Sequence, residues 1–510
     1  MKKLLIIFAA SLTMASCTSF LNVETLGKST IAGFFADIDG LQAAGLGLHR
    51  LGTELYDDDY IRLGELSGDN LFLYRINASQ ALQLVYDFES QPADNSGYPY
   101  TFWKHAYEVC TNANNILFYG KQLLESFPES ADVINRHFGY AYFARALAIF
   151  DLCNVYAMPY DYTPDASHLG VVAIDYIPGF DAELPRNTIA DCYKLVISDL
   201  EEGIKCFGQE TESTPTYMSA LACKALLARV YLYMKDYDKA ASYAKEVMDV
   251  VPLTPRSDYV NMFRRAQNYP GEAIFRLNTY ASGSGMANIC SPLSSQDCGP
   301  DPAFVATFSS DDIRRELLTY VAETEDGEEY AGRSYSAICK YLPFKSGESR
   351  SENRRCDHFV LRVSEMYLIH SEALCLGGGD LSAAADDIKA LRARALGKDK
   401  SEINLVYSGA AALDGIIQEE RSKELCFEGH RFFDLKRRGE DIVRSATSSS
   451  TMKHLKYPDY RYALPIAQLE MQSNDFMEQN EEIRYVTLDF PRVRQLAKED
   501  PELFLQQFFL

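Results

Sequence analysis

Residues Glu419 to Gly439 read EERSKELCFEGHRFFDLKRRG, and this stretch decides the fold that we expect. Eleven of its residues are charged, with phenylalanine and leucine side chains between them. The pattern predicts two short helices. Gly429 would end the first helix and Gly439 the second, because glycine adopts the left-handed conformation without steric cost.

Three carboxylates would line one face of the first helix, because Glu420, Glu424 and Glu428 recur every fourth residue. They would be either an acid/base pair of the glycosidase type or the anionic half of an Arg/Glu network that clamps two helices. We favour the network, because an arginine beside a carboxylate holds it ionised, whereas a general acid needs a raised pKa. The arginines that we expect within reach are Arg421, Arg431 and Arg437.

The same stretch resembles the C-terminal signature of the SusD/RagB family of nutrient-binding outer-membrane lipoproteins, roughly E-R-x-x-E-L-x-F-E-G-x-R-x-x-D-L-x-R-x-G. The matching residues are Glu420, Arg421, Glu424, Leu425, Phe427, Glu428, Gly429, Arg431, Asp434, Leu435, Arg437 and Gly439. The resemblance implies an all-α, tetratricopeptide-like fold with long irregular loop insertions. It also implies a protein on the outer face of an outer membrane that binds glycan, or peptide, and delivers it to a SusC-like TonB-dependent transporter.

The start of the chain predicts export. Residues 1–16 have two lysines, a short apolar run and small residues before Cys17, which is typical of a signal peptide. The ending Met14-Ala15-Ser16-Cys17 resembles a lipoprotein signal, so we expect lipidation of Cys17. Several acyl chains on one residue would hold the protein stably on a membrane. Plain cleavage, with Cys17 uninvolved, is the alternative.

Helical repeats predict the scaffold. Residues Ala220 to Pro252 match the tetratricopeptide pattern, and Arg362 to Arg394 form a weaker copy. Such helix pairs must stack to bury their apolar faces. Further helices are expected over Ile38 to Leu51, from Trp103, over Arg136 to Tyr156 and over Thr188 to Gly203.

The insertion Thr254 to Asp357 is rich in glycine and aromatic residues, which favours a function over disorder. We therefore divide the chain into a signal peptide (1–16), an N-terminal helical part (17–253), a C-terminal part with the insertions (254–480) and an extra tail (481–510). We assign no function to the tail, which could be an additional helix or a partner contact.

Composition excludes some classes of function. The formal charge is −22, from 50 Lys and Arg against 72 Asp and Glu, which argues against nucleic-acid binding. The sequence has no HExxH pair, no G-x-S-x-G elbow and no complete phosphate-binding loop, so we expect no catalysis, no cofactor and no metal. Asp57 to Asp59 could bind calcium, but without the ligand spacing of a calcium loop we expect a solvated charge run.

Most of the twelve cysteines are expected to be buried and free, because several lie within apolar helical patterns. Cys290 and Cys298, in the loop ICSPLSSQDC, are the one pair that we would test for a bridge.

Tyrosine suits ligand binding because it offers an apolar ring and a hydrogen-bonding tip. From loop position and chemistry we predict ligand contacts at Asp69, Asn70, Tyr74, Arg75, Tyr98, Tyr280 and Tyr335. A surface-exposed binder of glycan, or peptide, is the favoured function. A tethered glycoside hydrolase and a periplasmic helical-repeat scaffold remain as alternatives.

Overall fold

The computed structural model of the protein describes residues 30–94, 97–208, 214–263, 271–279, 284–293, 295–322, 328, 331–342 and 356–480. The chain is 57% helix and 7% strand, which confirms the predicted all-α, tetratricopeptide-like class. The predicted lipidation site Cys17, the predicted contact Tyr280 and the tail 481–510 lie outside the described residues.

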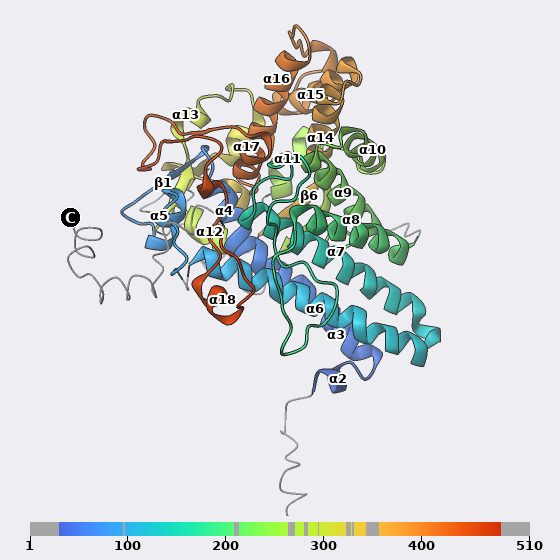
Figure 1. Ribbon diagram of the computed structural model, residues 1–510. Helices are drawn as coiled ribbons and strands as arrows, with labels where there is room; N and C mark the ends of the chain where they lie inside the picture. The colour runs from blue at the N-terminus through green and yellow to red at the C-terminus, as the bar shows by residue number, and fades with distance from the viewer. Residues whose placement is uncertain are drawn as a thin grey trace, which may run out of the picture.

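A stack of antiparallel helices forms the body of the molecule (Figure 1). Its members are α3 (Ile38–Glu54), α6 (Tyr98–Ser126), α7 (Ala131–Tyr156), α8 (Ile189–Phe207), α9 (Ala220–Met234), α10 (Tyr237–Met248), α14 (Val363–Leu376), α15 (Leu381–Leu396) and α16 (Ala410–Glu424). Each helix from α6 to α10 contacts the next, α10 contacts α14, and α14 contacts both α15 and α16. The helical stack is therefore continuous in space, although the insertion separates α10 from α14 in the sequence.

Both predicted repeats are confirmed as helix pairs, α9 with α10 and α14 with α15. The first pair begins where the Ser219 hydroxyl accepts the Ala222 N–H at 3.2 Å. Lys235, in the left-handed conformation, and Asp236, which caps α10, make its tight turn. Local sequence thus specifies the start of the repeat and its turn.

Two helix boundaries differ from the predictions. Helix α6 begins at Tyr98 rather than Trp103, because Pro99 suits the first turn of a helix. Helix α16 ends at Glu424 rather than Gly429. Residues 425–429 form a turn in which Phe427 (φ 63°) and Gly429 (φ 85°) are both left-handed. Gly439 ends the next helix, α17 (Arg431–Arg438), as predicted.

Shorter elements complete the fold. The remaining α-helices are α2 (Ile31–Phe34), α4 (Ile61–Leu66), α5 (Gln80–Tyr86), α11 (Arg256–Phe263), α12 (Gly285–Cys290), α13 (Pro302–Val305) and α18 (Gln468–Ser473), and a π-helical turn spans Leu55–Tyr60. The strands are β1 (Leu71–Leu73), β2 (Ala273–Asn278), β3 (Cys298–Pro300), β4 (Thr319–Val321), β5 (Ser334–Ser336), β6 (Asp357–Arg362), β7 (Ile442–Val443) and β8 (His454–Leu455). All of them form antiparallel pairs, β1 with β3, β2 with β6, β4 with β5 and β7 with β8.

The insertion is closed at its base by β2 and β6, which pair from Ala273↔Arg362 to Asn278↔Asp357. Between them the chain forms α12, β3, α13, β4 and β5 on one side of the molecule, with α8 to α10 on the other (Figure 1). The loop region therefore projects from one flank of a rigid helical scaffold.

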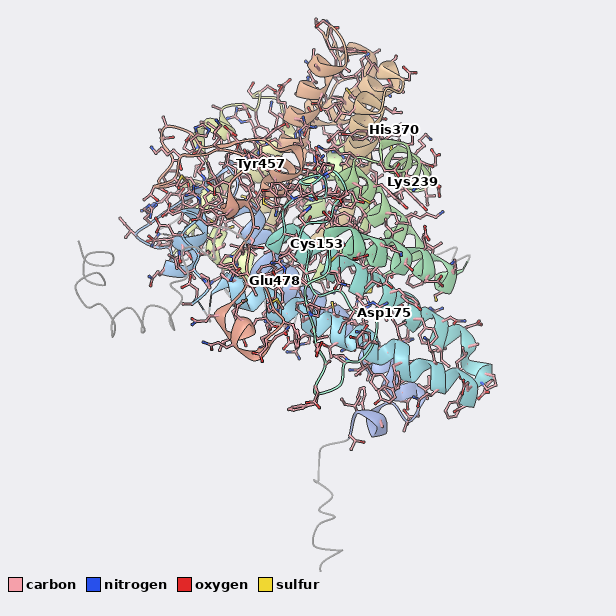
Figure 2. The ribbon with its side chains drawn as sticks, in the orientation of Figure 1. Cys153, Asp175, Lys239, His370, Tyr457 and Glu478 are labelled. Carbon is pink, nitrogen blue, oxygen red and sulfur yellow. The ribbon has the colours of Figure 1, made fainter. Side chains whose placement is uncertain are left out.

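The main hydrophobic core extends from Phe35 to Met477 and includes residues from every helix of the stack except α15 and α16, which enclose a smaller core with α14. All eleven cysteines after Cys17 are free in the structure, and ten of them are buried. Cys153 of α7, for example, is 2% exposed among packed side chains (Figure 2). This confirms that most of the thiols are buried. Among the described helices, none combines the length and apolarity needed to cross a membrane.

Candidate functional site

The carboxylates of the signature belong to a buried ionic network. Glu424 accepts ion pairs from Arg394 (2.6 Å), Arg362 (2.7 Å) and Arg314 (3.2 Å). The network's carboxylates are Glu272, Asp312, Glu420, Glu424 and Glu428, and its cations are Arg314, Lys340, Arg362, Arg392 and Arg394. Five negative charges thus face five positive charges.

Arginine contacts decide between the two interpretations of these carboxylates. Burial alone would raise the pKa of Glu424. The guanidinium groups of Arg394 and Arg362 outweigh burial and hold this pKa well below its ordinary value. The pKa of Glu420 is lowered in the same way, against burial, by Arg314 and Arg392. A carboxylate held ionised cannot serve as a general acid. The structural network is therefore confirmed.

The cations predicted for this network were wrong. Arg421 pairs with Asp434 (2.8 Å), Arg437 with Glu372 (2.6 Å) and Arg431 with Asp69 (2.6 Å). Successive helical residues point about 100° apart, so Arg421 cannot share the face of its neighbour Glu420. The cations that pair with Glu420, Glu424 and Glu428 come instead from the insertion, from Arg362 at the end of β6 and from α15.

The aspartates at 57 and 59 are buried, which corrects the predicted solvated charge run. Asp57 accepts hydrogen bonds from the Ser284 hydroxyl and the Gly285 N–H, both at 2.6 Å, and pairs with His358 at 2.6 Å. Burial raises the pKa of Asp57, but the His358 pair and these hydrogen bonds lower it more, to about 2. Asp57 thus fastens the start of α12 to the scaffold. No group of three or more His, Cys, Asp or Glu side chains suited to a metal occurs among the described residues.

The short β1–β3 pair joins the early loop to the insertion. Its register is Leu71↔Pro300, Phe72↔Gly299 and Leu73↔Cys298. Beyond the strands, the Tyr74 N–H donates to the Asp297 carbonyl at 2.8 Å, and the Asn77 side chain donates to the Gln296 carbonyl at 3.1 Å. Two segments more than two hundred residues apart therefore form one surface.

Half-buried aromatic side chains lie on the strands that the loop containing Gln296 joins. Phe72 and Tyr74 lie with ring centroids 5.3 Å apart. Tyr320 and Tyr335 are directly opposite each other on β4 and β5. The Gln296 side chain donates to the Ser336 carbonyl at 2.7 Å, which ties β5 to the loop that holds Tyr74. We call the residues Phe72, Tyr74, Tyr320 and Tyr335, whose strands this loop joins, the loop face. Tyr320 also packs against a smaller core cluster that includes Tyr259 and Phe263.

Glycine at position 299 allows the close approach of these parts. A Cβ atom there would lie 3.0 Å from the Tyr74 hydroxyl oxygen and 3.3 Å from the Ser336 carbonyl oxygen. The Tyr74 ring therefore packs against the backbone of Gly299, and the Ser336 carbonyl of β5 lies next to the same glycine. Burial raises the pKa of Tyr74, so its hydroxyl stays protonated and able to donate a hydrogen bond.

A polar cavity of about 580 Å³ opens at the other end of β1. Asp69 and Asn70 line it, together with Phe304, Lys423 and Arg431. Asp69 is held by two hydrogen bonds from Arg431, at 2.6 and 2.8 Å, and the Asn70 amide donates to the Ser422 hydroxyl at 3.1 Å. Three strand residues span roughly 10 Å, so the cavity and the loop face are neighbours.

Two predicted contact residues are placed elsewhere. Arg75 pairs with Asp87 at 2.7 Å and donates to the Ser449 carbonyl, so its guanidinium holds the early loop together. Tyr98 is 7% exposed in the main core. Of the predicted set, the structure thus brings Asp69, Asn70, Tyr74 and Tyr335 to one region.

Sequence reasoning missed Phe72, Tyr320 and the cavity residue Phe304. The short apolar run LFLY at 71–74, which follows Gly68-Asp69-Asn70, was a usable signal for a strand that contains Phe72. Nothing local marks Tyr320 as the partner of Tyr335.

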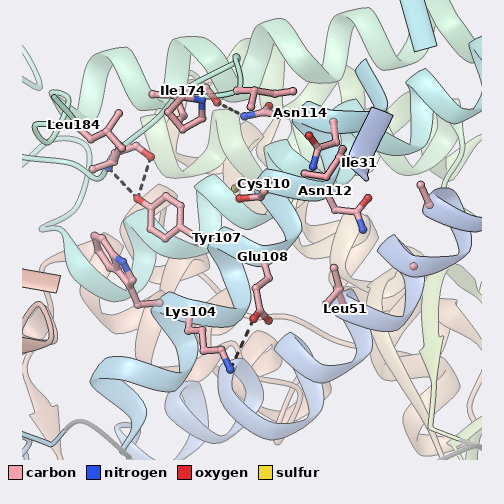
Figure 3. A pocket seen from close by; sticks show the side chains of 18 of the residues that line it. Ile31, Leu51, Lys104, Tyr107, Glu108, Cys110, Asn112, Asn114, Ile174 and Leu184 are labelled. Atoms are coloured by element: carbon pink, nitrogen blue, oxygen red, sulfur yellow. Dashed lines mark hydrogen bonds and ion pairs between the residues drawn. The ribbon is translucent and has the colours of Figure 1, made fainter. Parts of the chain in front are cut away.

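A larger cavity of about 1120 Å³ lies between α2, α3, α6 and the segment 172–184 (Figure 3). Its walls are largely apolar and include the buried Trp103. The Tyr107 hydroxyl donates to the Val172 carbonyl at 2.9 Å and the Asn114 amide to the Tyr176 carbonyl at 2.8 Å, which closes one wall. These two hydrogen bonds hold the segment 172–184 against α6.

Comparison with known proteins agrees with these features. The family described as "SusD family" matches residues 230–482, and the one described as "Starch-binding associating with outer membrane" matches residues 53–232. SusD-like protein P2 of Formosa agariphila is 26% identical over 478 residues, covering 86% of this chain and 91% of that protein.

Solved structures share the fold. A putative sugar binding protein from Bacteroides vulgatus superimposes with a TM-score of 0.74 at 23% identity, covering 87% of this chain and 98% of that one. A SusD superfamily protein from Bacteroides thetaiotaomicron has a TM-score of 0.74 at 25% identity, covering 87% and 99%.

Proposed function

The chain belongs to the SusD family, and from this premise we propose that it captures a nutrient glycan at the cell surface and delivers it to a SusC-like TonB-dependent transporter. The observation that carries the proposal is the loop face beside the polar cavity. Aromatic rings stack on the apolar faces of sugars, and polar side chains bind their hydroxyl groups.

Binding, rather than catalysis, is the mechanism that this arrangement supports. Of the two signature carboxylates on α16, Glu420 and Glu424 are both 1% exposed or less and matched by arginines, and their lowered pKa values leave them without a proton to donate. The rings of the loop face lie on loops and short strands fixed to the scaffold by Asp57 and the β2–β6 pair. Preorganised loops reduce the ordering entropy that a ligand must overcome.

Membrane attachment completes the proposal. Cys17 would carry the lipid, and the twelve residues 18–29 would connect it to Thr30 of the scaffold. Fully extended, this tether reaches at most ~40 Å, so Thr30 would stay within that distance of the membrane. Orientation toward the cell exterior is part of the same proposal.

The test uses residues 18–510, incubated with a panel of polysaccharides and peptides, and scores both retention and product release. We expect retention of one glycan class without products. Replacing Tyr74 or Tyr335 by Ala should weaken the affinity about tenfold or more, since each ring contributes roughly 1.4 kcal/mol or more through buried apolar area. Tyr176→Ala is the matched control. Tyr176 is also partly exposed (50%), but it lies beside the larger cavity and is not part of the loop face.

Other outcomes would replace the proposal. Product release that disappears on removal of a single carboxylate would establish a hydrolase. Protection from protease on intact cells, with no retained glycan or peptide, would establish a periplasmic scaffold. The Cys17→Ala variant should leave the membrane and abolish growth on the captured nutrient.

A further inference from the structure

Two thiols meet beneath the loop face. Cys290 is the last residue of α12 and Cys298 the first residue of β3, and both are completely buried. Their sulfur atoms are 3.7 Å apart. A disulfide bond is about 2.05 Å long, so the two atoms need to approach by only about 1.7 Å.

The backbone already holds the two cysteines side by side. The Asp297 N–H donates to the Ile289 carbonyl at 2.8 Å, so the residues directly before each cysteine are hydrogen-bonded to each other. The next residue, Gly299, is fixed in turn by the register of β3 with β1. The hydrogen bonds of the main chain therefore hold the two thiols next to each other.

We propose that Cys290 and Cys298 form a disulfide bond in the exported protein, closing the loop 291–297 at its base. This loop is the part of the insertion that holds the loop face together. Its Asp297 carbonyl accepts the Tyr74 N–H, its Gln296 carbonyl accepts the Asn77 amide, and the Gln296 side chain donates to β5. The bond would therefore fix the position of Tyr74 relative to Tyr335.

The bond must form before the loop packs. Burial, together with the neighbouring Cys298, raises the pKa of the Cys290 thiol well above its ordinary value, and only a thiolate is nucleophilic. In the unpacked chain, one cysteine thiolate attacks the disulfide of an envelope thiol–disulfide oxidoreductase and forms a mixed disulfide. The second cysteine then displaces the oxidoreductase. The protein loses two electrons and two protons, and the oxidoreductase disulfide takes up both to become a dithiol.

The first experiment expresses the full chain with its signal in a Gram-negative host and denatures the membrane fraction in urea with an alkylating reagent. Peptide mapping follows, with and without prior reduction. We expect Cys290 and Cys298 to be alkylated only after reduction, and Cys206, which is half-buried, to be alkylated in both samples. Mapping is needed because Cys153 and Cys192 also contact each other. Alkylation of both Cys290 and Cys298 without reduction would overturn the proposal.

A second experiment tests the order of events. Protein made without its signal in a reducing cytosol is folded first and then treated with a disulfide-bearing oxidant. We expect Cys290 and Cys298 to stay reduced in the folded protein and to join when it is refolded in the oxidant. Rapid bonding in the folded protein would show that burial does not protect the pair, contrary to the proposed order.

The consequence for ligand binding rests on the proposed function. The variant Cys290→Ser/Cys298→Ser should retain the glycan several-fold less tightly than wild type, and Cys206→Ser should match wild type. Equal retention by the double variant would refute the coupling to the loop face. If wild type retains no glycan while mapping still finds the bond, the proposed function fails and the cross-link stands.

Discussion

Removing the charge of Glu424 without changing its shape is the sharpest test of the buried network. Its Oε1 atom receives Arg394 at 2.6 Å, Arg362 at 2.7 Å and the Tyr259 hydroxyl at 3.1 Å, and its Oε2 atom receives Arg314 at 3.2 Å. In Glu424→Gln the amide keeps one acceptor but turns a donor toward the arginines. Five cations would then face four anions inside the protein.

The expected loss is large because no water reaches the unmatched charge. Glu424 is completely buried, and removal of one partner from a buried ion pair typically destabilises a protein by about 3–5 kcal/mol. The same substitution at Glu419, also on α16, should change the free energy of unfolding by less than about 1 kcal/mol. Its side chain is 55% exposed and pairs only with Lys423 and Arg392 near the surface.

Urea denaturation followed by circular dichroism measures both variants against wild type. We expect a clear fall in the midpoint for Glu424→Gln and almost none for Glu419→Gln. A further variant, Glu424→Met with Arg394→Met, should lose less than the sum of its single changes, because it removes a matched pair. Equal midpoints for Glu424→Gln and Glu419→Gln would refute the reasoning that the network is dry and charge-balanced.

Three further predictions follow from close contacts and burial. Gly64→Ala should destabilise the protein by roughly 3 kcal/mol, because the added Cβ would lie 2.4 Å from the Gly429 carbonyl oxygen; urea midpoints measure this. Gly299→Ala should weaken glycan retention with a smaller change in the midpoint, because it displaces Tyr74; retention unchanged from wild type would contradict this. Burial raises the pKa of the Glu65 carboxyl from 4.5 to about 7, so the folded state binds the carboxyl proton more tightly than the unfolded state does. The stability that this proton contributes is therefore lost as pH rises from about 4.5 to 7. Glu65→Gln should remove that part of the pH dependence, measured as melting temperature from pH 5 to 8.

The helical scaffold was predictable because its signals are local. In the stretch from Ala220 to Pro252, the Asp236 cap and the spacing of apolar residues each depend on residues only a few helical turns apart. The signature likewise indicated a charged network correctly. Its cations were not predictable from spacing, since Arg314 lies 110 residues from Glu424 in the chain and only the folded insertion brings them together.

The candidate site was predictable only in part, for the same reason. Tyr74 and Tyr335 were chosen for their chemistry and loop position, and both lie on strands joined by the loop that contains Gln296. Their aromatic partners depend on the β4–β5 register and on the closeness that Gly299 permits, which are long-range facts. Tyr98 illustrates the converse, because a loop-like sequence around a proline proved to be the buried start of α6.

The buried network also constrains the order in which the chain folds. Its charges come from the insertion, from Arg362 at the end of β6, from α15, and from α16 with the turn that follows it. The network is therefore dominated by contacts between residues distant in sequence. Such contacts form slowly, because loop closure must precede them. Until α16 arrives, Arg314, Arg362 and Arg394 lack the carboxylate that they share. A chain that ends before α16 would lack Glu424 and would leave these three arginines without their shared carboxylate. We therefore expect a stable fold only after the C-terminal half of the chain is complete.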